Sequence, residues 1–302
     1  MTPITLFKRY VWLIDTIYSA YSISKEEIDH RWSLSTLNDS HESQIPRRTF
    51  FRHKEAIQEI FGVNIACDKT KGSVYYIENR EEIEHDTIRQ WVISTFSVNN
   101  LLTKREYLRD KILLENIPSG QTYVTRILDS IDHGQQLSII YQSFFDDTPY
   151  NVIVEPYCLK LFKQRWYVLS HRPDKMQLRV YALDRISSLS LTGSSYTIPK
   201  TFDAELFFSN YYGVLLNRKV DKIVLRVTNF RAKYLNSLPL HHTQQVIKTD
   251  KGFTWLELHV APTFDFIQEI RSMGNEVLIE APNYLRNELL FDYQTSQELY
   301  NK

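Results

Sequence analysis

The stretch RWYVLSHRPDKMQLRVYALDRI, residues 165–186, decides the fold of the middle of the chain. Its second half alternates, so that Leu178 and Val180 fall on one side of an extended backbone and Arg179 and Tyr181 on the other. The four residues RPDK at 172–175 predict a turn, because proline and aspartate favour one. The pattern therefore predicts two β-strands joined by this turn, the second running into a Leu-Asp-Arg-Ile sequence.

Positive charge is concentrated around these two strands. Residues 156–186 contain seven Lys or Arg and two Asp, a net charge of +5, whereas the whole chain has 36 basic and 36 acidic residues. Guanidinium groups offer planar sets of donors that suit phosphate and carboxylate groups. Charge and pattern alone leave two interpretations open. Either the strands bind an anionic ligand, or Trp166 and Tyr167 are core residues and the arginines form a solvated face.

The same region resembles a WYL domain, which is named for a Trp-Tyr-Leu tripeptide. The tripeptide is here Trp166-Tyr167-Val168, with a conservative valine at a β position. Three further family features are a tyrosine in an early strand, a proline before the next strand, and an Arg-x-Tyr-x-Leu-Asp-Arg-Ile ending; they stand at Ile140-Tyr141, Glu155–Leu159 and Arg179–Ile186. The resemblance implies a five-stranded, Sm-like or SH3-like β-barrel that senses ligands in bacterial transcription factors.

Length and composition are those of an ordinary globular protein. The 302 residues predict two or three domains, and 43% hydrophobic with 24% charged residues do not indicate a disordered chain. There is no run of about 18 apolar residues and no convincing signal peptide, so we expect a cytoplasmic protein that does not enter the membrane. Cys67 and Cys158 are far apart and predict neither a disulfide framework nor a metal pair. Zero net charge confines any nucleic-acid contact to local patches.

The first 79 residues predict a winged helix-turn-helix domain that binds DNA. Ser24 and Glu27 resemble a capping box at the start of a second helix, Pro46 opens a third helix, and Gly62 ends it. Two strands then flank a basic loop at 68–73, as in a hairpin. The expected elements are helices at 3–20, 25–34 and 47–61 and strands at 63–67 and 74–77.

The third helix carries the argument for DNA binding. Its inward arc is expected to hold Thr49, Phe50, His53, Ala56, Ile57, Ile60 and Phe61. The opposite arc begins with cations and ends with acids, against the helix dipole, which favours the reverse order by ~0.3–1 kcal/mol per charge. A DNA major groove in front of the helix N-terminus would account for this order, and a solvated basic face is the alternative. The predicted DNA-binding residues are Arg47, Arg48, Thr49, Phe51, Arg52 and Lys54, with Lys69 and Lys71 in the wing.

Three of these positions have alternatives. Phe51 could contact a thymine methyl group or pack on the wing, and Lys69 and Lys71 could contact phosphates or be solvated turn residues. The run PRRTFFR at 46–52 also resembles the recognition helix of WYL regulators. Family members often carry an Asp where this chain has His53.

The rest of the chain predicts three further parts. Residues 80–122 are charged and predict a helical connector, 123–200 hold the WYL-like segment, and 201–302 have the β-α-β-β-α-β order of a ferredoxin-like fold. In this order the first helix is expected at 229–237 and the third strand at 253–260. This last part also resembles the C-terminal extension of WYL proteins at Leu238-Pro239, Gln244, Ser272–Gly274 and Ala281-Pro282. The predicted fold class is therefore α+β, with several domains.

The WYL resemblance also implies a ligand site. Arg179 and Arg185 are expected to hold an anionic effector, such as a nucleotide, single-stranded DNA or another phosphate-bearing metabolite. Trp166 is expected to be a core residue. The predicted ligand-binding residues are Tyr141, Ser143, Tyr157, Lys160, Tyr167, His171, Arg179 and Arg185.

No motif indicates an enzyme. The chain has no dinucleotide-binding, P-loop, nucleophile-elbow or zincin pattern, and the pair His241-His242 has no acidic or cysteine partner at ligand spacing. We therefore expect no catalytic residue, no metal and no cofactor. The favoured function is a ligand-responsive transcription regulator that reads a near-palindromic operator as a homodimer. A nucleic-acid-binding module without sequence preference, acting on single-stranded DNA or RNA, and a protein-interaction scaffold are the alternatives.

Overall fold

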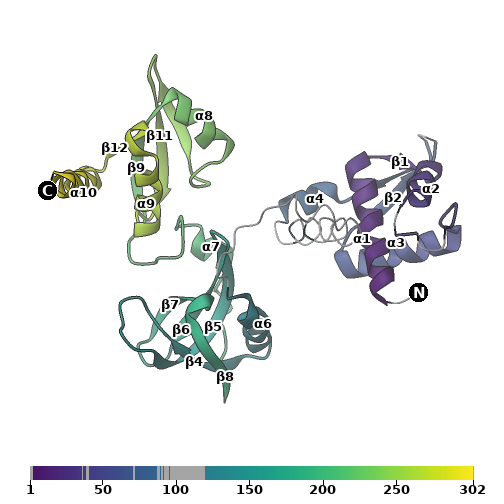
Figure 1. Cartoon of the computed structure of the whole chain (residues 1–302), viewed down its shortest axis with the longest axis horizontal. Coiled ribbons are helices and arrows are strands. Elements are labelled where there is room, and N and C mark those ends of the chain that lie inside the picture. Colours follow the sequence, from purple (N-terminus) through teal and green to yellow (C-terminus); the bar gives the residue numbers. More distant parts are fainter. Residues whose placement is uncertain are drawn as a thin grey trace. The chain divides into compact units, whose positions relative to one another are not determined.

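The computed structural model describes residues 3–35, 37–38, 41–70, 72–86, 89, 91, 95 and 120–301. The chain divides into two compact units, residues 1–115 and 116–302, whose helices and strands are labelled in Figure 1. Both units combine helices with antiparallel sheets, so the chain is of the predicted mixed α+β class. Most of the predicted connector at 80–122 lies outside the described residues, apart from helix α4 (Arg80–His85). None of the described helices is long and apolar enough to cross a membrane.

The N-terminal unit packs three helices against a three-stranded sheet. The strand order is β1-β3-β2, and both pairings are antiparallel. Because β1 lies between α1 and α2 in sequence, its pairing with β3 anchors the β2–β3 hairpin to the helices. The elements are α1 (Pro3–Ala20), β1 (Ile23–Ser24), α2 (Lys25–Ser33), α3 (Arg47–Phe61), β2 (Ile65–Asp68) and β3 (Val74–Ile77).

Local sequence signals set the ends of these helices. Ser24 Oγ accepts a hydrogen bond from the backbone N–H of Glu27 at 3.1 Å, which confirms the predicted cap of α2. Gly62 follows α3 with a φ of 61°, in the left-handed region that glycine adopts without strain. Pro46 precedes the first residue of α3, where its missing N–H removes no helical hydrogen bond.

The core of this unit is apolar, and one residue departs from the predicted pattern. Trp32, Phe50 and Ile57 are fully buried. The predicted inward face of α3 is confirmed at Phe50, His53, Ile57 and Phe61, whereas Ile60 is 53% exposed. Ile60 lies at the edge of the buried face of α3, in the last turn of the helix, where the core no longer covers its side chain.

The second unit begins with a five-stranded antiparallel sheet in the order β7-β6-β5-β4-β8. Among the described residues no pairing joins β7 to β8, so the strands form an open sheet and not the expected closed barrel. The one-turn helix η3 (Leu183–Arg185) leads the chain from one edge of this sheet to the other. The elements are η2 (Gln121–Tyr123), α6 (Val124–Asp132), β4 (Gln135–Tyr141), β5 (Tyr150–Phe162), β6 (Arg165–Arg172), β7 (Gln177–Ala182) and β8 (Ile186–Ser195).

The register sorts the side chains of this sheet into two faces. On the inner face, Val168 pairs with Tyr181 and Ser170 pairs with Arg179, and the core lies on this side. On the outer face, β5 and β6 pair Lys160 with Tyr167. Because successive side chains of a strand point to opposite faces, residues that are neighbours in the sequence lie on different sides of the sheet.

The last part of the chain is a four-stranded antiparallel sheet in the order β10-β11-β9-β12, with α8 and α9 packed on one face. The β-α-β-β-α-β order is as predicted, and α8 and β11 have the predicted limits. Ile223, Leu225 and Leu258 point from the sheet toward the helices. The elements are α7 (Ala204–Phe208), β9 (Asp221–Thr228), α8 (Asn229–Ser237), β10 (Gln245–Thr249), β11 (Phe253–Val260), α9 (Phe264–Ser272), η4 (Gly274–Glu276), β12 (Val277–Ala281) and α10 (Asn283–Tyr300).

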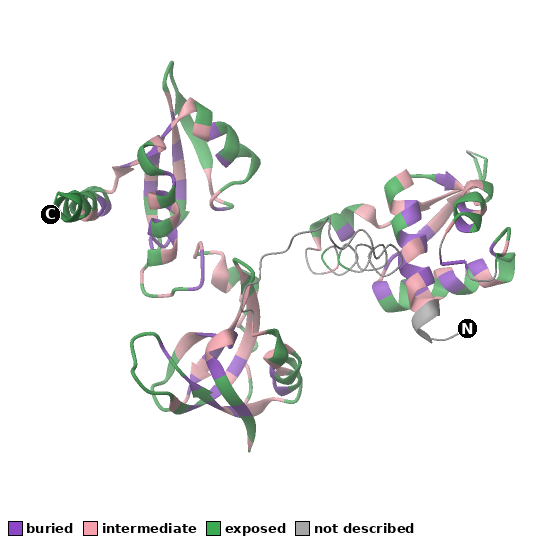
Figure 2. Cartoon of the chain, viewed as in Figure 1, coloured by how far each residue is buried: buried purple, intermediate pink, exposed green. Residues whose placement is uncertain are grey.

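Helices α6 and α10 were not predicted. In α10 only Leu285 and Leu289 are buried, and Figure 2 shows the rest of the helix largely exposed. Its other apolar residues, which include Phe291 and Leu299, lie on several sides of the helix, so no single stripe marks it in the sequence.

Candidate nucleic-acid and ligand interfaces

The exposed face of α3 carries three arginines. Arg47, Arg48 and Arg52 are exposed, and within the described part of the chain none of them forms an ion pair with an acid. The first turn of α3 contains no acidic residue. Since the helix dipole already makes this end positive, the positive potential here is not balanced locally.

Phe51 lies among these cations and is 42% exposed. Cζ of Arg47 lies 5.9 Å from its ring centroid, and Nζ of Lys54 lies 5.7 Å from it. The same ammonium group is 5.5 Å from the ring of Tyr75 on β3, and burial lowers the pKa of Lys54. Lys54 thus stands between Phe51 and the hairpin, while Thr49 is half-buried.

The tip of the hairpin holds Lys69, which is exposed in the turn after β2. Oδ1 of Asp68 accepts hydrogen bonds from N and Oγ1 of Thr70, at 2.9 and 2.6 Å, and so fixes this turn. The second predicted wing residue, Lys71, lies outside the described residues.

His53 lies on the buried side of α3, behind the exposed arginines. Its ring meets that of Tyr10 edge-on, with 5.2 Å between centroids. Burial, together with the positive charges of Arg9 and Arg52, lowers the pKa of His53 to about 4. The imidazole is therefore neutral at pH 7 and belongs to the core.

The predicted ligand residues do not converge on one point. Arg179 is on the inner face of the five-stranded sheet, and Tyr141 lies in the core on that side. Lys160, Tyr167 and His171 are on the outer face, as is Tyr157, whose ring lies near His171. Ser143 follows β4, and its Oγ accepts a hydrogen bond from N of Phe145 at 3.2 Å.

The inner face collects buried polar groups at one end. The hydroxyl oxygens of Tyr150 and Ser170 are buried and, among the described residues, have no hydrogen-bond partner. The buried hydroxyl of Tyr181 faces the guanidinium of Arg172. Arg172, only 7% exposed, is hydrogen-bonded to Asp174, with 3.0 Å between Nε and Oδ1. Buried hydroxyls are normally paired, so this end of the sheet is suited to an additional polar ligand. Sequence reasoning missed these residues.

Two predicted residues border this cluster. Arg179 Cζ lies 5.5 Å from the Tyr181 ring, and burial raises the pKa of Tyr181 to about 12, so its hydroxyl stays neutral. The Tyr141 ring meets that of Tyr181 edge-on at 5.0 Å, and its hydroxyl accepts a hydrogen bond from N of Ala182 at 3.4 Å. Burial also raises the pKa of Tyr141.

Arg185 stacks on an exposed ring beside the same end of the sheet. Its Cζ lies 3.6 Å from the ring centroid of Phe144, which is 75% exposed, while its Nε is buried without a partner among the described residues. The Nε–H group of this guanidinium is therefore a hydrogen-bond donor without an acceptor among the described residues.

The outer-face residues already have partners. Lys160 Nζ donates to the carbonyl oxygen of Gly213 at 2.8 Å and lies 4.1 Å from the ring of Phe208. Burial lowers the pKa of Lys160 to about 8. Nδ1 of His171 and Oε2 of Glu155 are 2.7 Å apart. The Lys160 contacts connect the sheet to the segment that follows it, whereas the His171–Glu155 contact joins β6 to β5, and both leave little for a ligand.

Comparison with known domain families assigns two segments. Residues 122–191 match the WYL domain. Residues 219–290 match the WCX domain. The WYL match runs from just before α6 into β8 and so contains both faces of the sheet, and neither match reaches the N-terminal unit. Trp166 of the WYL domain is half-buried and packs against the core, in agreement with its predicted place.

Two solved structures are similar to the chain at low identity. Proteasome accessory factor B/C (PafBC) of Arthrobacter aurescens is 17% identical, with a TM-score of 0.41, over 98% of this chain and 48% of that one. A CRISPR Cas-related protein is 11% identical, with a TM-score of 0.39, over 100% of this chain and 87% of its own. The chain thus spans about half the length of the PafBC chain. No protein with a curated description matched.

Proposed function

We propose that this chain is a ligand-responsive, DNA-binding transcription regulator. In this proposal the N-terminal unit is a winged helix-turn-helix that reads duplex DNA, and the WYL domain senses an anionic effector. The observation that carries the proposal is the exposed face of α3, where Arg47, Arg48 and Arg52 stand at the positive end of the helix without acidic partners in the described chain.

Duplex DNA explains this arrangement physically. Three guanidinium groups at a helix N-terminus repel one another and the helix dipole, and phosphates or guanine edges would remove that repulsion. Lys69 at the hairpin tip is in the position from which a wing contacts the backbone of the duplex. The pairing of β1 with β3 holds the hairpin against the helical core.

The effector site is proposed at the polar end of the inner face of the WYL domain. Arg179 and Arg185 would provide the positive charge, while the unpaired hydroxyls of Tyr150 and Ser170 would donate hydrogen bonds. This set suits a phosphate group, and hence a nucleotide or a short single strand. The effector would act by binding more tightly to one of two arrangements of the units.

Homodimerisation and the absence of catalysis are parts of the same proposal. A two-fold dimer would place two copies of α3 on the two half-sites of a near-palindromic operator. No residue of the two interfaces is assigned a catalytic role.

The test is fluorescence anisotropy with labelled duplexes tiled across the region upstream of the chain's own gene. Salt-sensitive binding to one tile, in preference to scrambled duplexes, is the expected result. Equal, weak binding to all duplexes would contradict sequence-specific reading and favour the second candidate, a single-strand binder without sequence preference. Absence of any duplex binding, with and without added nucleotides and oligonucleotides, would favour a scaffold.

A further inference from the structure

Strand β8 forms one edge of the WYL sheet. Its ten residues, ISSLSLTGSS at 186–195, contain no charge and no proline. It pairs with β4 on one side, and no described strand pairs with its other side. Edge strands are normally blunted by shortness, charge, proline, bulges or a covering segment, because their free backbone N–H and C=O groups can pair with another strand. The pairing of β8 with β4 is irregular at Ser187 and after Leu191, and the stretch between them, 188–191, is regular.

The other edge strands of the described chain carry such protection. Arg179 lies in β7, Asp68 in β2, Lys248 in β10 and Glu280 in β12, and β1 has only two residues. Two identical strands that pair across a two-fold axis bring like charges close together. Among the described edge strands of more than two residues, β8 is therefore the one that could pair with the same strand of a second copy without electrostatic repulsion.

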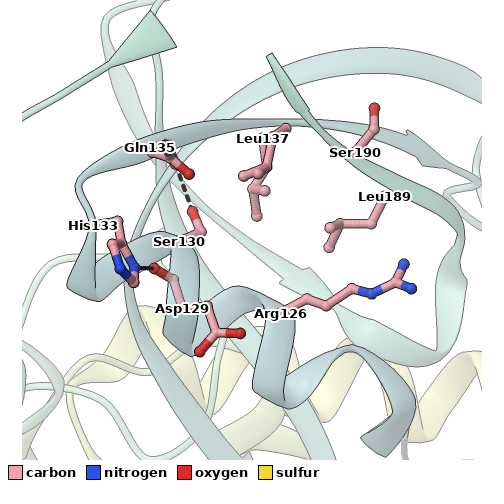
Figure 3. A pocket seen from close by; sticks show the side chains of 9 residues that line it. Arg126, Asp129, Ser130, His133, Gln135, Leu137, Leu189 and Ser190 are labelled. Atoms are coloured by element: carbon pink, nitrogen blue, oxygen red, sulfur yellow. Dashed lines mark hydrogen bonds between the residues drawn. The ribbon is translucent and has the colours of Figure 1, made fainter. Parts of the chain in front are cut away.

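The inner side of β8 borders a groove with leucines on one wall and polar side chains on the other. The groove has a volume of about 480 Å³ and lies between α6 and strands β4 and β8. Figure 3 shows Leu137 and Leu189 on its wall and the side chain of Arg126 extending from α6 toward β8. Leu191 belongs to the same side and is 57% exposed. The apolar side chains on the inner face of the sheet thus continue to its edge strand, where Leu191 is left exposed.

We propose that β8 pairs antiparallel with β8 of a second copy of this chain, across a two-fold axis at Ser190. In this register Leu189 of each copy lies opposite Leu191 of the other, and both lie in the regular part of the strand. The two five-stranded sheets become one continuous sheet, and the exposed Leu191 side chains gain apolar neighbours. The surface belongs to the regulator proposed above, but it does not depend on DNA reading.

Disulfide crosslinking of the full chain tests the register. Ser190→Cys, in a background with Cys67→Ser and Cys158→Ser, places two cysteines directly opposite each other. Their Cα atoms would be roughly 4.5–5.5 Å apart, which suits a disulfide. Ser187→Cys in the same background is the matched control, because its two copies would be roughly 20 Å apart along the strands.

The expected result is a covalent dimer with Ser190→Cys under mild oxidation and little or none with Ser187→Cys. The absence of a dimer with Ser190→Cys, or equal dimer with both variants, would overturn the proposal. Failure of the duplex-binding assay would leave this result unaffected, so the two proposals fail separately.

A second measurement avoids the cysteine changes. Leu191→Lys adds a like charge on each copy beside the axis and is expected to raise the dimer Kd at least tenfold, as measured by sedimentation equilibrium. Ile153→Lys is the matched control, since Ile153 is 47% exposed on the same sheet but lies away from β8. A monomeric wild-type chain at micromolar concentration, or unchanged association of Leu191→Lys, would contradict the proposal. An extended peptide that bound β8 of such a monomer would assign the edge to a different partner.

Discussion

Arg172 is almost fully buried and hydrogen-bonded to Asp174, whereas Arg48 and Arg52 are exposed and have no acidic partner in the described chain. A buried guanidinium without a partner would cost several kcal/mol, so the first arrangement is explained by the fold alone. The second is not explained by stability, because it opposes the helix dipole. At the scale of single residues, this contrast separates arginines that serve the structure from arginines for which we propose a ligand.

Removal of the α3 arginines should weaken duplex binding. Arg48→Ala or Arg52→Ala is expected to cost about 1–3 kcal/mol of binding free energy if the side chain reads a base, and less if it contacts only phosphate. Anisotropy titration against the preferred duplex measures this, with Arg286→Ala on the exposed side of α10 as control. Wild-type affinity in both α3 variants would contradict their role.

Lys69 should act through the salt dependence of binding. If its ammonium contacts a phosphate, Lys69→Ala weakens all duplexes alike and lowers the slope of log K against log salt by roughly one unit. Titrations at four or more salt concentrations determine the slope. A slope equal to that of the wild type would identify Lys69 as a solvated turn residue.

His53 should make the N-terminal unit sensitive to acid. The folded state holds its pKa at about 4, below the ordinary value of 6.5, so the unfolded state takes up the proton first as the pH falls. Stability is therefore lost as the pH drops from about 6.5 toward 4, and a shift to pH 5 should lower the free energy of unfolding by about 2 kcal/mol. Denaturant unfolding at pH 7 and pH 5 checks this.

His53→Gln should remove most of that loss, whereas His133→Gln, at an exposed position, should not. Equal pH dependence of both variants would show that His53 is not the responsible group.

At the scale of elements, periodic patterns predicted α1, α3, α8 and β11 closely. α10 was not predicted, because only two of its residues, both leucines, are buried and they leave no apolar stripe in the sequence. The site was harder to predict, because its residues were chosen by family position and not by strand face. A bulge between Pro156 and Cys158 places Lys160 on the outer face. Ordinary alternation along β6 places Tyr167 and His171 there too, opposite the face of Arg179.

Gly120 marks the point where the chain enters the WYL domain. Its φ is 66°, and an added Cβ would lie 2.4 Å from the backbone of Leu183 and of Asp184. Gly120→Ala should therefore strain the contact with η3 and lower the melting temperature by several degrees, equivalent to about 1–3 kcal/mol. Gly252→Ala is the control, since its Cβ would meet nothing within 4 Å. Similar melting temperatures for the two variants would contradict this role.

At the scale of the whole molecule, equal numbers of acidic and basic residues rule out a uniformly basic surface. The proposed recognition of anions would therefore depend on two local patches, one in each unit. The arginines of both patches are among the residues predicted from the sequence. The buried hydroxyls of the second one become visible only when the strand register is known, because Tyr150 and Tyr181 come from strands β5 and β7.

The two patches should be separable by mutation. Arg179→Ala or Arg185→Ala is expected to abolish the response of DNA binding to the effector while leaving duplex affinity without effector unchanged. Anisotropy with a panel of nucleotides and short single strands measures the response, and Lys233→Ala on exposed α8 is the control. An unchanged response in both arginine variants would remove them from the site.

Strand β5 runs without interruption from Tyr150 to Phe162. At its first end, Tyr150 belongs to the polar cluster of the WYL domain, and beyond its last residue Lys163 Nζ lies 2.7 Å from Oε2 of Glu269 on α9. The first five residues of β5 pair with β4 and its remaining eight pair with β6, and a bulge follows the change of partner, between Pro156 and Cys158. Because a bulge bends a strand, a displacement of Tyr150 by a bound molecule would reach α9 through a bent strand, and the bulge is the place where the movement could change direction.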